Sequence, residues 1–74
     1  MEDIEATIAQ VERSLTNITP SEDQIERIEM LRRNARDLAR AVIRYSLPSR
    51  ERSLAITKLE ETVMWAVKGV LLNG

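Results

Sequence analysis

The sequence has no cysteine and no histidine, only two glycines and two prolines, and one tryptophan and one tyrosine as its aromatic residues. Disulfide bonds, thiol chemistry and a zinc site built from the usual ligands are therefore excluded. No apolar run of about 18 residues occurs, and no basic leader precedes an apolar segment, so neither a membrane span nor secretion is predicted. We expect a cytoplasmic protein that uses no cofactor and no metal.

Catalytic groups are equally scarce. Without histidine or cysteine, a nucleophile and its base could come only from serine or threonine with Lys58. Glu60 and Glu61 are adjacent, so on a helix they point about 100° apart and cannot converge on one substrate atom. No glycine-rich loop that could hold a phosphate is present. We do not expect an enzyme.

The small size of the chain predicts self-association. Seventy-four residues allow one domain, and a core of that size rarely supplies more than about 3–5 kcal/mol without disulfides, metals or association. Hydrophobic residues make up 43% of the sequence. Since disulfides and the usual metal ligands are missing, association remains as the way to cover the apolar side chains.

The net charge of −1 hides a polarised chain. Residues 1–29 hold eight acids and two bases, a charge of −6, whereas residues 30–58 hold eight bases and two acids, a charge of +6. Such blocks suit either contact between the acidic part of one subunit and the basic part of another, or a basic pocket for a small anion. The overall charge argues against binding of duplex DNA.

Helical spacing of apolar residues predicts three helices. The first, about residues 2–15, has its apolar residues on one face: Ile4, Ile8, Val11 and Leu15. For the second helix, Thr19 is the predicted N-cap, Pro20 the first helical residue and Glu22 the third. This helix keeps its spacing to about residue 46, with the following apolar positions: Ile25, Ile28, Leu31, Ala35, Leu38, Val42 and Tyr45.

A short corner separates the second helix from a third, about residues 50–72. Pro48 disfavours helix in the residue before it, and Ser49 can cap the helix that follows. The third helix has its own apolar stripe: Ala55, Leu59, Val63, Ala66 and Val70. Because the corner is short, the two long helices must form an antiparallel hairpin. Five residues lie off the stripes and are expected between hairpins: Met30, Met64, Trp65, Leu71 and Leu72.

The predicted fold is therefore all-α, with a short N-terminal helix followed by a long antiparallel helical hairpin in an oligomeric helical bundle. Residues 1–18 are assigned to the N-terminal helix and a linker, and residues 19–74 to the hairpin domain. The first helix could be mobile or could pack on a neighbouring subunit.

Arginines on the second helix form the first candidate site: Arg32, Arg33, Arg36, Arg40 and Arg44. Guanidinium groups suit phosphates because they donate paired hydrogen bonds and stay charged at any working pH. The alternative is a solvated helix face on which Asp37 pairs with Arg33 or Arg40.

The start of the third helix is the second candidate site. Arg50 and Arg52 flank Glu51 near exposed backbone amides that could receive an anion, and Ser53 and Thr57 add donors. The alternative is a capped helix start without a ligand. The two aromatic residues, Tyr45 and Trp65, could stack on a nucleobase or could simply fill a core or an interface.

Residues 49–66 resemble the signature of the phage sponges that antagonise the CBASS and Thoeris immune systems, a family of helical hairpins. The resemblance covers about residues 19–66 and rests on thirteen positions at fixed spacing: Ser49, Arg50, Glu51, Ser53, Leu54, Ala55, Thr57, Leu59, Glu60, Glu61, Met64, Trp65 and Ala66. The preceding helix is similar at Pro20, Gln24, Arg27, Leu31, Arg32, Ala35, Leu38 and Ala39.

The resemblance implies a homohexamer that binds cyclic nucleotide second messengers, either cyclic di- or trinucleotides or cyclic ADP-ribose isomers, and sequesters them without cleavage in the cytoplasm of the infected bacterium. Arg32 matches a basic position of the family and is the best candidate phosphate ligand. Arg50 and Thr57 match signature positions. The predicted ligand-binding set is Arg32, Arg36, Arg50, Thr57, Asn17 and Asn34.

Three positions depart from the family pattern. Asn17, Ile18 and Thr19 precede Pro20, where the family has an aromatic residue or histidine that can stack on a base. Val67 and Leu72 occupy positions at which the family has asparagine and arginine. These differences predict a narrower or shifted range of ligands.

Two other functions compete with the sponge. The first is a structural or regulatory interaction module whose surface around Met64 and Trp65 binds a partner protein and no small ligand. The second is a small helical DNA-binding regulator, which would bind duplexes with a steep dependence on salt. Because the first third of the chain is acidic, the DNA-binding regulator is the least favoured of the three functions.

Overall fold

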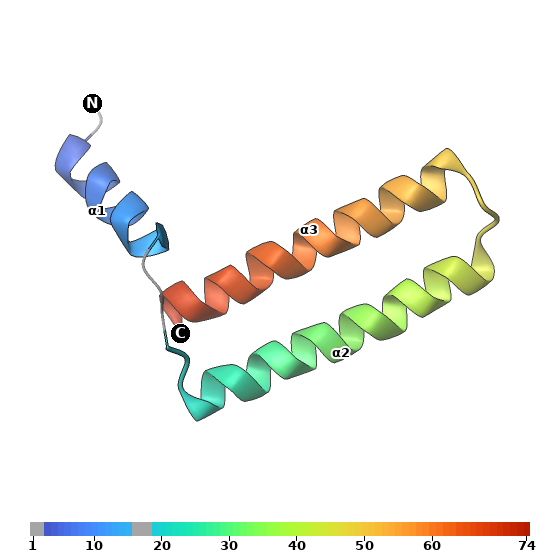
Figure 1. Ribbon diagram of the computed structural model, residues 1–74, viewed down its shortest axis with the longest axis horizontal. Coiled ribbons are helices and arrows are strands. Elements are labelled where there is room, and N and C mark those ends of the chain that lie inside the picture. The colour runs from blue at the N-terminus through green and yellow to red at the C-terminus, as the bar shows by residue number, and fades with distance from the viewer. Residues whose placement is uncertain (1–2, 16–18) are drawn as a thin grey trace.

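The computed structural model describes residues 3–15 and 19–74, and this part of the chain contains three helices and no strand. α2 (Glu22–Tyr45) and α3 (Arg50–Asn73) form a long antiparallel hairpin, and α1 (Ile4–Leu15) stands at an angle to it at the open end, beside the C-terminus (Figure 1). The predicted all-α class and the helical hairpin are both confirmed.

α2 begins two residues later than the sequence predicts. Ser21 is the N-cap, and its side chain accepts a hydrogen bond from the Gln24 amide at 3.2 Å while Gln24 Oε1 accepts one from the Ser21 amide at 2.9 Å. The prediction of Thr19 as the cap and Pro20 as the first helical residue was wrong. A serine with glutamine three residues later satisfies two orphan amides reciprocally, and this capping box prevails over the preference of proline for the first helical position.

The corner between α2 and α3 is fixed by hydrogen bonds to backbone groups. Ser49 caps α3 as predicted, accepting from the Arg52 amide at 3.1 Å. Arg52 Nη1 donates to the carbonyl oxygens of Ile43 (3.3 Å) and Ser46 (3.2 Å), and the Ser46 hydroxyl donates to the Val42 carbonyl. The Val42 carbonyl also accepts the Ser46 amide at 3.1 Å. The Ile43 carbonyl is one of the last four of α2, which lack amide partners within the helix, so its bond from Arg52 satisfies it and ties α3 to the corner.

The open end of the hairpin is held by Gln24 as well. Its Nε2 donates to the Val70 carbonyl at 3.1 Å, so the residue that completes the cap of α2 also binds the last turns of α3. Each end of the hairpin therefore has one side chain that binds backbone carbonyls outside its own helix. This side chain is Gln24 at the open end and Arg52 at the corner. These contacts fix how far one helix can slide along its partner.

The seam between α2 and α3 is thin. Among the described residues only Ile28 is buried, at 6% exposure. Most residues of the predicted stripes lie half-buried along the seam: Leu31, Ala35, Val42, Leu59, Val63, Ala66 and Val70. Four others are exposed, namely Ile25, Leu38, Tyr45 and Ala55. Two helices cover only a narrow strip of each other, so the stripes are wider than the seam.

The apolar face of α1 is also largely uncovered. Ile4 and Leu15 are 66% and 79% exposed, and Ile8 and Val11 about half exposed. The radius of gyration of the chain is 16.2 Å, against about 11 Å for a compact domain of this length. The described part of the chain is therefore open, and much of its apolar surface is uncovered.

No helix within the described parts of the chain is long and apolar enough to cross a membrane.

Candidate anion-binding groove

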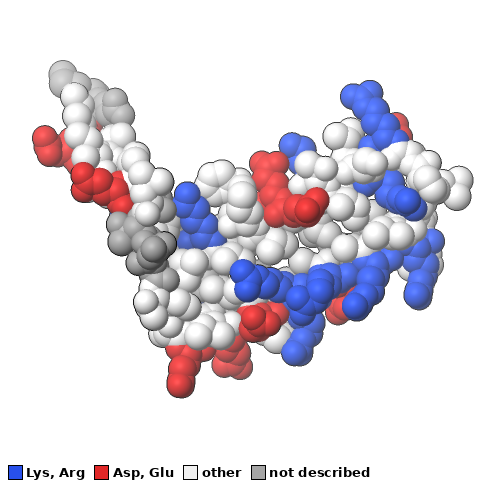
Figure 2. Space-filling view, viewed as in Figure 1, with Lys and Arg blue, Asp and Glu red and all other residues white. Residues whose placement is uncertain are grey.

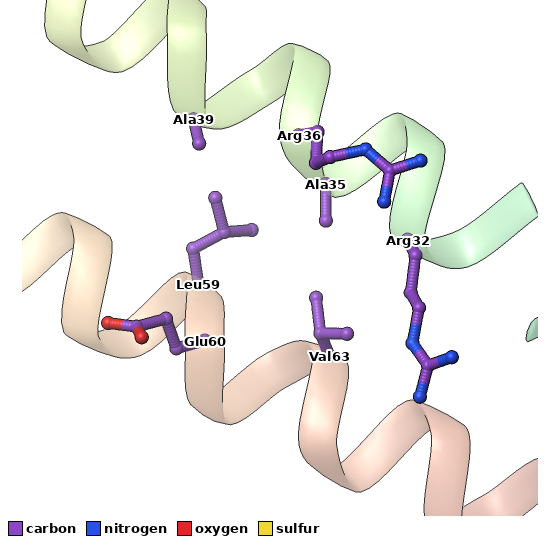
Figure 3. A pocket seen from close by; sticks show the side chains of 7 residues that line it. All are labelled: Arg32, Ala35, Arg36, Ala39, Leu59, Glu60 and Val63. Carbon is purple, nitrogen blue, oxygen red and sulfur yellow. The ribbon is translucent and has the colours of Figure 1, made fainter. Parts of the chain in front are cut away.

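A hollow of about 330 Å³ lies on one side of the hairpin seam, near its middle (Figure 3). α2 contributes two arginines and two alanines, and α3 contributes two apolar residues and a glutamate: Arg32, Ala35, Arg36, Ala39, Leu59, Glu60 and Val63. The α2 positions are spaced three and four residues apart, so they share one helix face. Their alanine methyl groups are too short to fill the space opposite Leu59 and Val63, which creates the hollow.

Arg32 and Arg36 form the basic rim of this hollow, one helical turn apart. The Arg32 side chain reaches from α2 toward α3, whereas Arg36 extends along α2 (Figure 3). Arg32 pairs with Glu29 at 3.9 Å, with both side chains at least half exposed. An ion pair of that length at the surface contributes little, about 0–1 kcal/mol. Arg36 has no ion pair with any residue that the structure describes, so both guanidinium groups are available to an anion.

A second hollow of about 200 Å³ continues the first along the same side of the seam. Arg32 borders both, and the second is lined mainly by apolar residues: Pro20, Ile25, Ile28, Val67 and Leu71, together with Glu29. From Leu59 to Leu71 the two hollows span about 18 Å along α3. We call this continuous feature, from Ala39 and Leu59 to Ile25 and Leu71, the side groove.

The remaining arginines of α2 lie outside the side groove. Four residues exceed one helical turn by about 40°, so a row of arginines at every fourth position winds around the helix. Arg40 pairs with Asp37 at 3.4 Å, as the solvated-face alternative predicts. Arg40 and Arg44 border a separate hollow of about 180 Å³ beside Tyr45. Basic side chains consequently gather along α2 toward the corner in Figure 2.

The structure brings together two of the six predicted ligand-binding residues, Arg32 and Arg36. Asn34 lies on the other side of the seam, in a hollow with Met30, Leu31 and Val70. Arg50 is exposed at the first turn of α3, and Thr57 is exposed two turns further on. Asn17 lies outside the described residues. Within one chain, the predicted set is thus distributed over several faces.

Several groove residues were assigned other roles by the sequence. Ala35, Leu59 and Val63 were assigned to the core stripes, and Glu60 was considered for catalysis and as a position of the family signature, but not as part of a binding site. The available signal was the run from Arg32 to Ala39, in which alanines alternate with arginines on one helix face. Arg52, in contrast, was considered for anion binding, and its guanidinium group binds the carbonyls of the corner.

A further hollow of about 350 Å³ lies between α1 and the end of α3. It is bordered by Arg13 of α1 and by Trp65, Lys68 and Leu72 of α3. Lys68 Nζ lies 5.3 Å from the centroid of the Trp65 ring, a cation–π distance. Trp65 is 57% exposed, so its ring belongs to a surface and not to the seam.

Comparison with known families matches residues 4–71 to the family described as Acb2/Tad1, hairpin domain. The match extends over nearly the whole chain and confirms the resemblance noted in the sequence; the chain belongs to this family. At the level of the family, the role is that of a phage anti-defence sponge. Comparisons with curated proteins and with solved structures gave no match.

Proposed function

We propose that this member of the Acb2/Tad1 hairpin family binds cyclic nucleotide immune signals and sequesters them without cleavage, so that CBASS or Thoeris effectors lose their activator. The signals are cyclic di- or trinucleotides or cyclic ADP-ribose isomers, and the site of action is the cytoplasm of the infected bacterium. The observation that carries the proposal is the side groove, where Arg32 and Arg36 border an apolar floor. Such a surface suits a ligand with phosphates on one edge and flat rings on the other.

The affinity that a sponge needs favours a site shared by several copies of the chain. A Kd of about 1 nM corresponds to about −12 kcal/mol. Hydrogen bonds to a charged group contribute about 1.5–3 kcal/mol each, so the paired bonds of two arginines supply about 6–12 kcal/mol. Immobilising the ligand costs about 4–15 kcal/mol, so a single open groove falls short of that affinity. A second copy closing the groove would exclude water and bring further donors. Arg50, Thr57, Asn34 and Asn17 are proposed to reach the ligand from neighbouring copies.

The exposed area supports self-association. The chain exposes 6297 Å², whereas a compact monomer of 8.5 kDa exposes about 4,700 Å². The excess of about 1,600 Å² equals roughly two interfaces of standard size per chain. Two interfaces per chain are enough to build an assembly larger than a dimer, in keeping with the proposed homohexamer.

Sequestration requires no chemical step. The carboxylates at the groove, Glu29 and Glu60, come from different helices, and neither has a histidine or cysteine partner because the chain contains none. We propose reversible trapping at equilibrium, in which the ligand is released unchanged when the protein unfolds.

Native mass spectrometry of the purified protein tests the proposal, with and without a mixture of cyclic dinucleotides, cyclic trinucleotides and cyclic ADP-ribose isomers. The expected result is a hexamer that gains discrete ligand masses, with each ligand recovered intact after denaturation. A hexamer that gains no mass would contradict the ligand-binding function while leaving the assembly in place. Ligand recovered as a linear or hydrolysed product would contradict sequestration without cleavage.

The exposed residues Met64 and Trp65 favour a second candidate function, the binding of a partner protein. The two residues are adjacent and are 56% and 57% exposed. Methionine and tryptophan are enriched at the centres of protein interfaces. A structural or regulatory module would use this surface for a partner protein and would show no thermal shift with any of the cyclic nucleotides.

A further inference from the structure

The hollow at the middle of the seam has opposite charges at its two ends. Arg32 and Arg36 border it from α2, and Glu60 borders it from α3. In Figure 3 the Glu60 carboxylate and the Arg32 guanidinium group lie at opposite ends of the hollow, with Leu59 and Val63 between them. In the described part of the chain, Glu60 pairs with neither arginine. A ligand in this hollow therefore meets a carboxylate at one end and cations at the other.

Glu60 differs from its neighbour Glu61 in what its side chain contacts. Glu61 pairs with Lys58 at 3.6 Å. Glu60 is exposed and makes no ion pair with any residue that the structure describes. Adjacent side chains on a helix point about 100° apart, and of the two glutamates only Glu60 lines the hollow. Both oxygens of its carboxylate are therefore available to donors on a ligand.

A carboxylate at this position distinguishes between nucleobases. Guanine offers two adjacent donors on its Watson–Crick edge, N1–H and the N2 amino group, and the two oxygens of one carboxylate can accept both at once. Adenine has an acceptor, N1, beside its N6 amino group, so it places a lone pair against one of the two oxygens. Unpaired bases are commonly recognised through hydrogen bonds on this edge. Glu60 therefore favours guanine over adenine.

The dimensions of the hollow agree with a nucleotide that extends from one charged end to the other. From Arg32 to Ala39 the helix α2 rises by about 10 Å. A base with its ribose and phosphate extends over a similar length, so its Watson–Crick edge can reach Glu60 while its phosphate reaches the arginines. Hydrogen bonds assisted by charge at both ends then hold the ligand in one direction.

We propose that the side groove prefers guanine-containing cyclic nucleotides and that Glu60 recognises the base. Glu60 accepts hydrogen bonds from guanine N1–H and from the N2 amino group. Arg32 and Arg36 bind the phosphate, and Leu59 and Val63 lie against the flat face of the ring. The inference rests on the proposed function, because it names which of the cyclic signals the same groove prefers.

Three ligands that differ only in their bases test the assignment: cyclic di-GMP, cyclic di-IMP and cyclic di-AMP. Hypoxanthine keeps N1–H but lacks the N2 amino group, and adenine lacks both donors at these positions. A good bidentate contact to a base contributes about 1–3 kcal/mol of discrimination. Compared with cyclic di-GMP, the wild type should bind cyclic di-IMP at least about fivefold and cyclic di-AMP at least about tenfold more weakly in isothermal titration calorimetry.

Glu60→Gln replaces one acceptor of the carboxylate by a donor. The amide can donate to adenine N1 and accept from its N6 amino group, but it cannot accept both donors of guanine. The affinity for cyclic di-GMP should fall about tenfold while that for cyclic di-AMP does not fall. The difference between cyclic di-GMP and cyclic di-IMP should shrink to less than about twofold, because the two losses are coupled. Glu61→Gln removes the same charge one residue along α3 and should leave the ratios of the three affinities unchanged.

The assignment is overturned if the wild type binds the three ligands equally, or if Glu60→Gln changes all three affinities by one factor, which is an effect of charge alone. It is also overturned if Glu61→Gln reduces the preference for guanine as much as Glu60→Gln does. A wild type that binds only adenine-containing cyclic nucleotides contradicts the role of Glu60 and leaves the proposed function in place. A wild type that binds no cyclic nucleotide contradicts the proposed function, and the preference for guanine with it. The comparison of cyclic di-GMP with cyclic di-IMP on the wild type needs no variant, so it decides even if Glu60→Gln fails to fold.

Discussion

At the scale of single residues, the side groove depends on arginines at its rim and alanines in its wall. Ala35 and Ala39 leave the space, and Arg32 and Arg36 supply the charge. Arg32 has the central position because it borders both hollows of the groove. Its partner Glu29, at 3.9 Å, competes with any anionic ligand for the same guanidinium group.

Replacement of Arg32 by alanine is expected to weaken binding of a cyclic dinucleotide about 10- to 100-fold, because charge-assisted hydrogen bonds contribute about 1.5–3 kcal/mol. Arg33→Ala is the matched control, since it removes the same charge one residue along α2. Isothermal titration calorimetry measures both affinities. Equal losses of affinity in the two variants would show that Arg32 affects binding only through the net charge of the protein and not through contact with the ligand.

Glu29→Gln is expected to raise the same affinity by up to about fivefold. The substitution removes an anion from the groove and frees Arg32 from an ion pair of about 0–1 kcal/mol. Glu5→Gln changes the net charge equally at a distance from the groove and serves as the control in the same calorimetric titration. A weaker affinity of the Glu29 variant would mean that Glu29 holds Arg32 in its binding orientation.

At the scale of elements, two side chains define the hairpin. Gln24 combines the cap of α2 with a bond to the Val70 carbonyl, and Arg52 binds the carbonyls at the end of α2. With only Ile28 buried among the described residues, the apolar seam alone determines the relative position of the two helices weakly. Polar contacts at the two ends therefore have an unusually large share in fixing the register.

Arg52→Ala is expected to lower the free energy of unfolding by about 1 kcal/mol, since two carbonyl oxygens at the corner lose their donor. For a chain of this size that corresponds to a fall of about 4–8 °C in Tm. Arg50→Ala removes the same charge from the same helical turn without breaking these bonds. Thermal unfolding followed by circular dichroism should show no fall in Tm for the control.

The helices were predictable from the sequence, whereas the site was only partly so. Apolar spacing and the Pro48–Ser49 corner define α2 and α3 because both signals are local. The start of α2 was misplaced because Thr19 and Ser21 are both capable caps, and only the pairing of Ser21 with Gln24 decides between them. The groove arises from the way α2 faces α3, so Ala39 and Glu60 could not be assigned to it from either helix alone.

At the scale of the whole molecule, the open shape and the proposed self-association together predict that stability depends on protein concentration. The chain has a thin seam, an uncovered α1 and an excess of exposed area of about 1,600 Å² over a compact monomer. In the proposed assembly, such a chain gains much of its stability from its neighbours. Folding and assembly are then linked by mass action.

Tm is expected to rise with protein concentration. A tenfold increase shifts a dimerisation equilibrium by about 1.4 kcal/mol, or about 0.7 kcal/mol per chain, which corresponds to about 3–6 °C for a domain of this size. Added salt should lower Tm at fixed concentration if the acidic part of one subunit contacts the basic part of another, because screening weakens that contact. Scanning calorimetry over two decades of concentration measures the slope, and a Tm independent of concentration would indicate a monomer.

The winding row of arginines gives α2 two basic surfaces that face different directions. Successive arginines advance by about 40°, so the row begins at the side groove with Arg32 and Arg36 and ends at the corner with Arg44. The 24 residues of α2 therefore present two basic surfaces, and Arg44 lies about 120° around the helix and about 18 Å along it from Arg32. A one-residue insertion between Arg36 and Arg40 would turn the basic surface at the corner by about 100° relative to the side groove.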